Sequence, residues 1–587
     1  MTTGAEGFEE GAGEANRRAA RLGELADAYW AAVLDAQPIL ATAIGDRRFD
    51  DRMPDPTPEG AATNRARAAA LLDELESIGP AEALPSGARV TWSTLRESLL
   101  GDIAALASGL SDWNVDSLEG VPAGLLVIPD FQRVDSPAAG DVLIARWHAM
   151  ARYVDAHAAT LRASLADGRV AATPTIDRNL QLLDGLLAEP TEQWPLVATP
   201  LASADAEGDA FPAAERERFQ AALLAVTGDE IRPAFARLRA FLADELRPAA
   251  RPDTSPGMGH VRGGLAGYRG LIRYHTSLDL APEAFHATGL AEIARIDAEI
   301  EALAGRVLGT RGLAEAIERL RSDPALGFST REEVLASGVE ALARANAVMP
   351  SFFGRLPKAP CVVVPMGPHE EEHGTIAYYR EPAADGSRPG QFYLNLAYPQ
   401  TRRRFEAEPL AYHEAVPGHH LQIAIMQELE DLPTFRRHLG VTAFVEGWGL
   451  YTERLADEMG LYSSDLSRLG VLSFDAWRAS RLVVDTGMHA RGWTRDQAIA
   501  FMTEHTALAA NNIANEVDRY IGLPGQALAY KTGQLEMLRL RADAQARLGA
   551  TFDIRGFHDV LLGSGAVPLT TMGELVHGWV EAQLGGS

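Results

Sequence analysis

Apolar residues recur every three or four positions along most of this chain, and this periodicity limits the fold more than any other feature. The spacing places apolar side chains along one face of an α-helix. A similar pattern covers residues 16 to about 35. Two further stripes are Ile231, Phe235, Leu238, Leu242 and Leu246, and Leu290, Ile293, Ile296, Ile300 and Leu303. The sequence therefore predicts a mainly α-helical protein.

The length of 587 residues predicts more than one hydrophobic core. A segment rich in proline and glycine, RPDTSPGMGHVRGG (251–264), is the expected boundary. The first residues are acidic and rich in glycine, which is typical of a frayed terminus. We expect a disordered tail over 1–15, an N-terminal helical lobe over 16–255 and a C-terminal lobe over 256–587.

One region, 361–399, has the composition of β-strands. Its segments CVVV, GTIAYY and QFYLNL are β-branched or aromatic, and DGSRPG between the last two is a turn sequence. The region predicts a small antiparallel sheet directly upstream of a histidine-rich segment. An edge strand of such a sheet can hold an extended substrate by main-chain pairing.

The overall charge excludes several classes of partner. The chain has 54 basic and 80 acidic residues and a net charge of -26, which argues against nucleic acid and anionic membranes. A single cysteine, Cys361, excludes an internal disulfide framework and a thiolate zinc cluster. No apolar run approaches the roughly 18–20 residues of a membrane span. The first residues lack the features of a signal peptide. We expect a soluble cytoplasmic protein, and the sequence leaves its oligomeric state open.

The segment YHEAVPGHHLQ (412–422) contains the first half of a zinc-hydrolase motif, His413-Glu414. The second histidine of that motif belongs at position 417, where this chain has Pro417. A straight helix would carry His419 about 9 Å along its axis. A kink over residues 416–418 could return His419 or His420 to the same ion. The alternative is a polar helix end with solvated histidines.

A carboxylate further along the chain favours the metal interpretation. Glu446, in FVEGWGLYTERLADEMG, lies in an otherwise apolar stretch, where a buried carboxylate needs a partner. Two histidines followed by a helix with a glutamate ligand is the order of a gluzincin site. We therefore expect one zinc ion, bound by His413, by His419 or His420, and by Glu446, although cobalt or manganese also suits such ligands.

Two more glutamates have expected roles around that ion. Glu414 is the expected general base, because it follows the first histidine ligand directly. Glu453 falls near the helix face of Glu446. It either orients a ligand imidazole or is an exposed charge paired with Arg454 or a neighbour.

These motifs, together with RLVVDTGMHARGW and RYIGLPGQALAYKTG, resemble the bacterial family called domain of unknown function 885, over roughly residues 260 to 580. That family is grouped with zinc metallopeptidases of the HExxH type. It is more distantly similar to helical carboxypeptidases and dipeptidases of the angiotensin-converting enzyme group. The resemblance implies a two-lobed helical clamshell with zinc in its cleft. Many family members look like lipoproteins. This sequence departs from that pattern, because it shows no lipobox.

The resemblance also implies roles for single residues. The relatives carry the second ligand in a Gly-His pair, which favours His419 and leaves His420 either behind the ligands or facing the substrate. They carry a histidine and then an Arg-Tyr pair, which His489 and Arg519-Tyr520 match, and Arg519 is expected to contact the substrate. His489 and Tyr520 are therefore the expected donors to the oxyanion. Asp485 would fix the tautomer of His489 or pair with Arg481.

Substrate binding is expected from side chains near these motifs. Tyr530 and Lys531 could hold a substrate carboxylate, because a lysine charge and a phenol both suit an anion. The alternatives on the sheet are Tyr378, Tyr379 and Arg380. For Lys531 and Arg380, the competing interpretation is a solvated charge on the protein surface.

The sequence as a whole predicts a zinc-dependent hydrolase of short peptides or peptide-like amides, of exopeptidase or dipeptidase type. One alternative is a hydrolase of a small-metabolite amide in a biosynthetic pathway. The other is a non-catalytic protein that retains a metal site.

Overall fold

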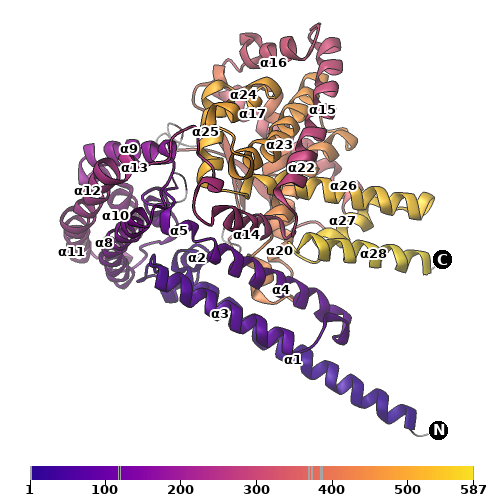
Figure 1. The fold of residues 1–587 in the computed structure, drawn as a ribbon, viewed down its shortest axis with the longest axis horizontal. Helices are drawn as coiled ribbons and strands as arrows, with labels where there is room; N and C mark the ends of the chain where they lie inside the picture. The colour runs from indigo at the N-terminus through magenta and orange to yellow at the C-terminus, as the bar shows by residue number, and fades with distance from the viewer. Residues whose placement is uncertain are drawn as a thin grey trace.

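The computed structural model describes residues 3–116, 118, 120–367, 371, 375–383, 386 and 388–585. The fold is mainly α-helical, which confirms the prediction from periodicity (Figure 1). The first helix, α1, spans Thr3–Ala36 and covers residues 3–15, where we expected disorder. The glutamates and alanines of this segment favour a helix and offset its glycines. Residues 1 and 2 lie outside the described part.

The first four helices share one core, and they are α1, α2 (Pro38–Ala43), α3 (Pro58–Ser77) and α4 (Ser86–Ala107). Buried leucines such as Leu22, Leu75 and Leu99 form this core, which Phe435 of the distant helix α21 (Thr434–His438) completes. Helix α4 also packs on α14 (Gly264–Thr276). The beginning of the chain is therefore joined to its second half by packing.

A second core has its buried residues between 115 and 246, including Trp147, Trp194 and Phe235. Its helices stand at one side of the molecule in Figure 1. The whole predicted stripe from Ile231 to Leu246 is buried here. The elements of this region are α5 (Leu110–Trp113), α6 (Ala123–Leu126), α7 (Ile128–Phe131), α8 (Pro137–Ala166), α9 (Thr173–Ala188), α10 (Pro195–Ala206), α11 (Ala213–Val226), α12 (Arg232–Phe241) and α13 (Arg247–Ala249), with π-helical turns at Thr227–Ile231 and Leu242–Leu246.

The second half of the chain surrounds two long helices, α22 (Thr442–Glu458) and α23 (Asp465–Arg491). Glycines allow close packing against both. A Cβ at Gly289 would lie 2.7 Å from side-chain atoms of Leu482 and Val483 on α23, and one at Gly447 would lie 2.5 Å from the Cα of Gly533. The other helices here are α15 (Pro282–Val307), α16 (Leu313–Ser322), α17 (Arg331–Phe352), α19 (Arg404–Glu414), α20 (His419–Gln427), α24 (Arg495–His505), α25 (Ala510–Gly522), α26 (Ala529–Leu548), α27 (Ile554–Leu562) and α28 (Leu569–Gly585).

The small sheet lies where the sequence places it, but it is mixed and not purely antiparallel. Its strands are β1 (Cys361–Pro365), β2 (Ala377–Arg380) and β3 (Gly390–Leu394), in the order β1-β3-β2. Strand β2 pairs antiparallel with β3, while β1 pairs parallel with β3. The parallel pair is feasible because residues 366–389, a connection of the length that parallel neighbours need, separate the two strands. Asp385 and Ser387 of the predicted turn lie outside the described residues.

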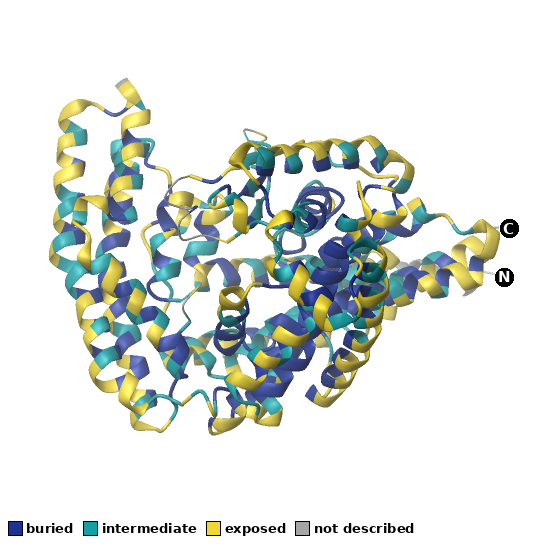
Figure 2. Cartoon of the chain, turned by 90° about the horizontal axis from the view of Figure 1, so that it is seen from above, coloured by how far each residue is buried: buried dark blue, intermediate teal, exposed yellow. Residues whose placement is uncertain are grey.

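Burial is greatest where these elements meet. Figure 2 shows buried residues gathered in the central helices, while the outer helices carry exposed residues on their outward sides. Within the described ranges, no helix combines the length and apolar character required for a membrane crossing. The division into lobes at residue 255 stays a prediction, because packing between α4 and α14 crosses it.

Candidate metal centre

The helix that begins with the zinc-like motif is interrupted between its two histidine positions. Helix α19 ends at Glu414, residues 415–418 are not helical, and α20 begins at His419. A Cβ at position 418 would lie 1.9 Å from the carbonyl oxygen of His413, so only glycine fits there. The indole of Trp448 donates a hydrogen bond of 2.9 Å to the carbonyl of Pro417. This break agrees with the kink predicted from the Pro-Gly step.

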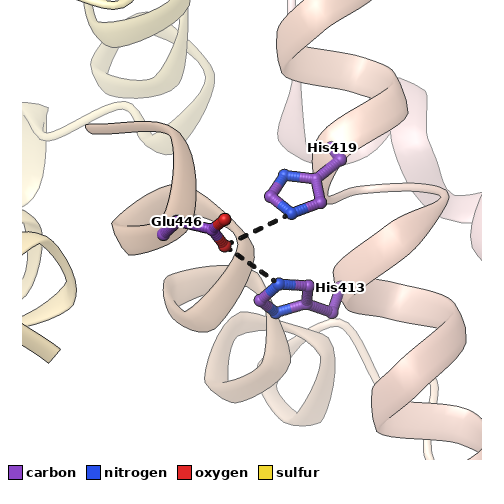
Figure 3. A group of neighbouring side chains, drawn as sticks. All are labelled: His413, His419 and Glu446. Carbon is purple, nitrogen blue, oxygen red and sulfur yellow. Dashed lines mark ion pairs between the residues drawn. The ribbon is translucent and has the colours of Figure 1, made fainter. Parts of the chain in front are cut away.

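The break brings His413 and His419 to one carboxylate. The Nε2 atoms of His413 and His419 lie 3.6 Å and 3.5 Å from Oε2 of Glu446, which comes from α22. Figure 3 shows the three side chains pointing toward one another. Their ligand atoms all lie within 4.8 Å of one another. Ligand atoms at tetrahedral positions about 2.1 Å from a zinc ion would be roughly 3.4 Å apart, so little movement would close them around one ion.

Glu453 fixes the orientation of the first histidine. Its Oε1 lies 2.8 Å from Nδ1 of His413, and the carboxylate is buried. Nδ1 therefore carries the proton donated to Glu453, and Nε2 faces Glu446. A Cβ at Gly449 would lie 2.7 Å from the His413 ring, so glycine allows α22 to approach this closely. The alternative of an exposed, surface-paired Glu453 is wrong.

The electrostatics of the three residues follow from burial and mutual contact. Burial alone would raise the pKa of Glu446, but His413 and His419 hold that pKa well below its usual value. Burial would lower the pKa of His413, but Glu446 and Glu453 outweigh it and raise the pKa to about 9. Within the described residues, Nδ1 of His419 is buried without a hydrogen-bond partner. Two imidazoles and one carboxylate are a donor set that zinc takes in catalytic sites, so the residues fit the ion.

Glu414 lies at the end of α19, next to the first histidine, and stays partly exposed. Burial raises the pKa of its carboxyl, and the two histidines oppose that rise. A glutamate with a raised pKa is a stronger base than a solvated one. Its chemistry therefore suits the predicted role as a proton acceptor.

His420 does not belong to this group. Its Nε2 lies 3.0 Å from the carbonyl of Ala359, and its Nδ1 lies 3.0 Å from the hydroxyl of Tyr379. Burial lowers the pKa of His420 to about 4, so the neutral ring donates to Ala359 and accepts from Tyr379. The predicted substrate contact of His420 is therefore wrong, because both of its ring nitrogens bind groups of the protein. Tyr379 is partly exposed, and its role stays a prediction.

Lys531 is also occupied internally. Its Nζ lies 2.6 Å from Asp475, 2.7 Å from the amide oxygen of Gln534 and 2.9 Å from Glu292. The side chain has no solvent exposure. The predicted contact of Lys531 with a substrate carboxylate is wrong, because three acceptors already use its three N–H groups.

The expected donors to an oxyanion also have internal partners. The backbone N–H of Met258 donates to Nδ1 of His489 at 3.0 Å, and Nε2 lies 2.9 Å from the carbonyl of Tyr520. Burial lowers the pKa of His489 to about 4, which fits a neutral ring with its proton on Nε2. Asp485 instead accepts from the hydroxyl of Tyr268. The expected role of His489 as a donor to substrate is wrong.

The hydroxyl of Tyr520 is buried and donates to Glu516 over 2.6 Å. It accepts from Arg481 at 2.9 Å. Arg519 is bound to the same Glu516 and to Gln526. The predicted contact of Tyr520 with substrate is therefore wrong, because this internal network uses its buried hydroxyl. Arg519 is partly exposed, and its role stays a prediction.

The expected substrate residues Tyr378, Arg380 and Tyr530 are partly exposed, as Tyr379 and Arg519 are. Burial raises the pKa of Tyr530, and the nearby carboxylate of Glu446 raises it further. The ring of Tyr378 stacks on Tyr393 with centroids 4.7 Å apart. Arg380 ends β2 opposite Gln391. The roles of Tyr378, Arg380 and Tyr530 stay predictions.

The sequence analysis did not predict that Trp477, Arg478 and Arg481 of α23 lie together beside the candidate metal centre. The guanidinium carbons of Arg478 and Arg481 lie 4.2 Å and 4.6 Å from the centre of the Trp477 ring. The signal was WRASR, two arginines three positions apart in a helix that is otherwise apolar there.

Comparisons with known proteins agree with this fold. A family described as "Bacterial protein of unknown function (DUF885)" matches residues 38–576. A solved structure of a "putative lipoprotein" from Colwellia psychrerythraea is 26% identical, with a TM-score of 0.86 over 97% of this chain and 99% of that one. A "putative lipoprotein of unknown function" from Shewanella oneidensis is 18% identical, with a TM-score of 0.73 over 95% and 99%, and shows the fold alone. No curated protein matches the chain. The cytoplasmic location stays a prediction.

Proposed function

The chain belongs to the bacterial DUF885 family, and from this premise we propose that it is a zinc-dependent hydrolase of amide bonds in short peptides or peptide-like molecules. One observation carries the proposal: His413, His419 and Glu446 direct their ligand atoms to one point, while Glu453 fixes the first imidazole from behind. The gluzincin-like order of these ligands in the sequence supports the same class.

The residues of the site would divide the work. His413, His419 and Glu446 would hold the ion, which when bound supplies Lewis acidity toward the scissile carbonyl and lowers the pKa of water. Glu414 would accept a proton from the attacking water and pass it to the leaving amine. Its partial exposure and raised pKa suit both transfers. Glu453 would keep the Nε2 lone pair of His413 directed at the ion.

The same residues would serve a hydrolase acting on the amide of a small metabolite. The peptide proposal rests on strand β2, an edge strand that contacts α19 and could pair with an extended main chain. Exopeptidase or dipeptidase action is the proposed mode. A non-catalytic protein is the less suitable alternative, since Glu414 has the position and the raised pKa of a base.

The substitution Glu414→Gln tests the proposal in the full-length protein. The variant should keep its zinc, measured by elemental analysis, because Glu414 is not among the three ligands. Its turnover of a library of short peptides should fall by about 10²–10⁴-fold. A matched control is Glu428→Gln, a partly exposed glutamate just after α20 that accepts from the backbone of Lys358. Parental turnover in Glu414→Gln, or a purified parent without metal, would refute the proposal.

A further inference from the structure

Helix α23 carries two buried arginines, three residues apart, on one aromatic side chain. The side chains of Arg478 and Arg481 are 6% and 4% exposed, and both guanidinium groups lie against Trp477. Residues three apart lie on the same side of a helix, so the two cations are neighbours. Two buried like charges at this distance require compensation.

The partners of these arginines leave part of each guanidinium unused. Arg481 donates to Tyr520 and, over 3.0 Å, to Glu516. The nearest carboxylate oxygen of Arg478 belongs to Glu453, at 3.8 Å. Within the described part of the chain, Nε and Nη1 of Arg478 and Nη1 of Arg481 are buried without a hydrogen-bond acceptor. A buried donor of a charged group that lacks an acceptor destabilises the fold, so the arrangement calls for an acceptor.

The unused donors lie beside the metal centre. Arg478 approaches Glu453, which binds His413, and its charge opposes the burial that raises the pKa of Glu414. The guanidinium carbon of Arg481 lies 4.3 Å from the ring centre of Tyr530, the phenol whose pKa Glu446 raises. Trp477 and Tyr530 are both partly exposed. Solvent therefore reaches the aromatic rings that hold these cations.

We propose that Arg478 and Arg481 form a carboxylate-binding subsite, so that the substrates are amides that carry a free carboxylate near the scissile bond. The inference rests on the proposed function and names its substrate class. Guanidinium groups bind carboxylates through paired N–H donors, and stacking on an indole fixes their planes without using those donors. The carboxylate of the substrate takes the acceptor positions that the protein leaves open. Its source is either the C-terminus of a peptide or an acidic side chain.

Binding to the Glu414→Gln protein, as isolated, tests the subsite without turnover. One titration compares an N-acetylated dipeptide that has a free C-terminal carboxylate with the same dipeptide as its C-terminal amide. A second compares amidated dipeptides that contain either a glutamate or a glutamine side chain. The free acid in one of these pairs should bind about 10- to 100-fold more tightly than its neutral partner, the range for hydrogen bonds to charged groups. The pair that shows the preference identifies the source of the carboxylate.

Substitution of Arg481 tests whether the preference for the free acid comes from the arginines of α23 or from the metal ion. Arg481→Gln, added to Glu414→Gln, should reduce the preference to about threefold or less, while Arg481→Lys keeps the charge and should retain part of it. The matched control is Arg541→Gln, a buried arginine of α26 that pairs with Glu458. Melting temperatures show whether each variant folds. Equal binding of acid and amide in both pairs, or an undiminished preference in folded Arg481→Gln, overturns the subsite. The proposed hydrolase fails separately, through absent zinc or unchanged turnover in Glu414→Gln.

Discussion

Two clusters of buried charge lie on neighbouring helices of the second half of the chain, and they differ in where their polar atoms point. Around Lys531, the ammonium group is surrounded by Asp475, Gln534 and Glu292, and Arg454 binds the same Asp475. Burial would raise the pKa of Asp475, but Lys531 and Arg454 hold that pKa well below its usual range. This cluster is closed, because its donors and acceptors meet one another.

The metal centre is open, because its polar atoms do not satisfy one another by hydrogen bonds. The Nε2 atoms of His413 and His419 lie 3.6 Å and 3.5 Å from Oε2 of Glu446, too far for good hydrogen bonds and suitable for a shared ion. The side chain of Glu446 keeps 20% of its surface exposed, while that of Lys531 keeps none. Residue type alone does not separate the two clusters, since both contain charged groups in apolar helices. The difference lies in whether the protein itself satisfies each group.

The largest expected effect is the loss of the ion from the open cluster. Glu446→Ala should remove most of the zinc, because it takes one of three protein ligands and leaves two histidines that bind far more weakly. Elemental analysis of the purified variant measures the metal, and circular dichroism follows the helices, which should stay intact. Glu446→Gln keeps the shape and serves as the control for packing. Full zinc occupancy in Glu446→Ala would remove this residue from the ligand set.

Substitution of Lys531 in the closed cluster should lower the stability of the protein and leave its metal content unchanged. Lys531→Met leaves Oδ1 of Asp475 and the amide oxygen of Gln534 without their donor in a buried site, whereas Glu292 keeps its contact with Arg295. The free energy of unfolding should fall by about 3 kcal/mol, near the lower end for a broken buried ion pair, because Arg454 still binds Asp475. Chemical denaturation measures the change, and elemental analysis should find the parental zinc content. Loss of zinc from a folded Lys531→Met protein would show that the two clusters are coupled.

The difference between the clusters also explains which parts were predictable from sequence. Helical spacing predicted the fold, and the His-Glu pair and the isolated Glu446 predicted two of the three converging residues. The Pro-Gly step left His419 and His420 open, and the family resemblance favoured His419, which is the one that converges. The second predicted stripe lies on a helix as expected, but its first residue, Leu290, is 45% exposed. Periodicity locates the buried face of a helix only to within about one position.

The roles of Lys531 and His489 were not predictable, because they depend on partners far away in the sequence. The groups that bind them, Glu292 and the backbone of Met258, are more than 200 residues distant. The same limit applies to the sheet, where β1 pairs directly with β3 although β2 lies between them in the sequence. Local patterns give residue types and helix faces, whereas hydrogen-bond satisfaction is decided by packing.

The smallest expected effect comes from the residue that supports the open cluster from behind. Glu453→Gln keeps the volume of the side chain but replaces the carboxylate that holds Nδ1 of His413 at 2.8 Å. An amide accepts this hydrogen bond more weakly and no longer increases the basicity of the imidazole, so zinc affinity should fall by about 10- to 100-fold. Competition with a chromogenic chelator measures the affinity. The control is Glu458→Gln on the same helix, whose carboxylate binds Arg541 and not a histidine, and which should keep the parental affinity. Equal zinc affinity in Glu453→Gln and the parent would mean that packing against Gly449 alone orients His413.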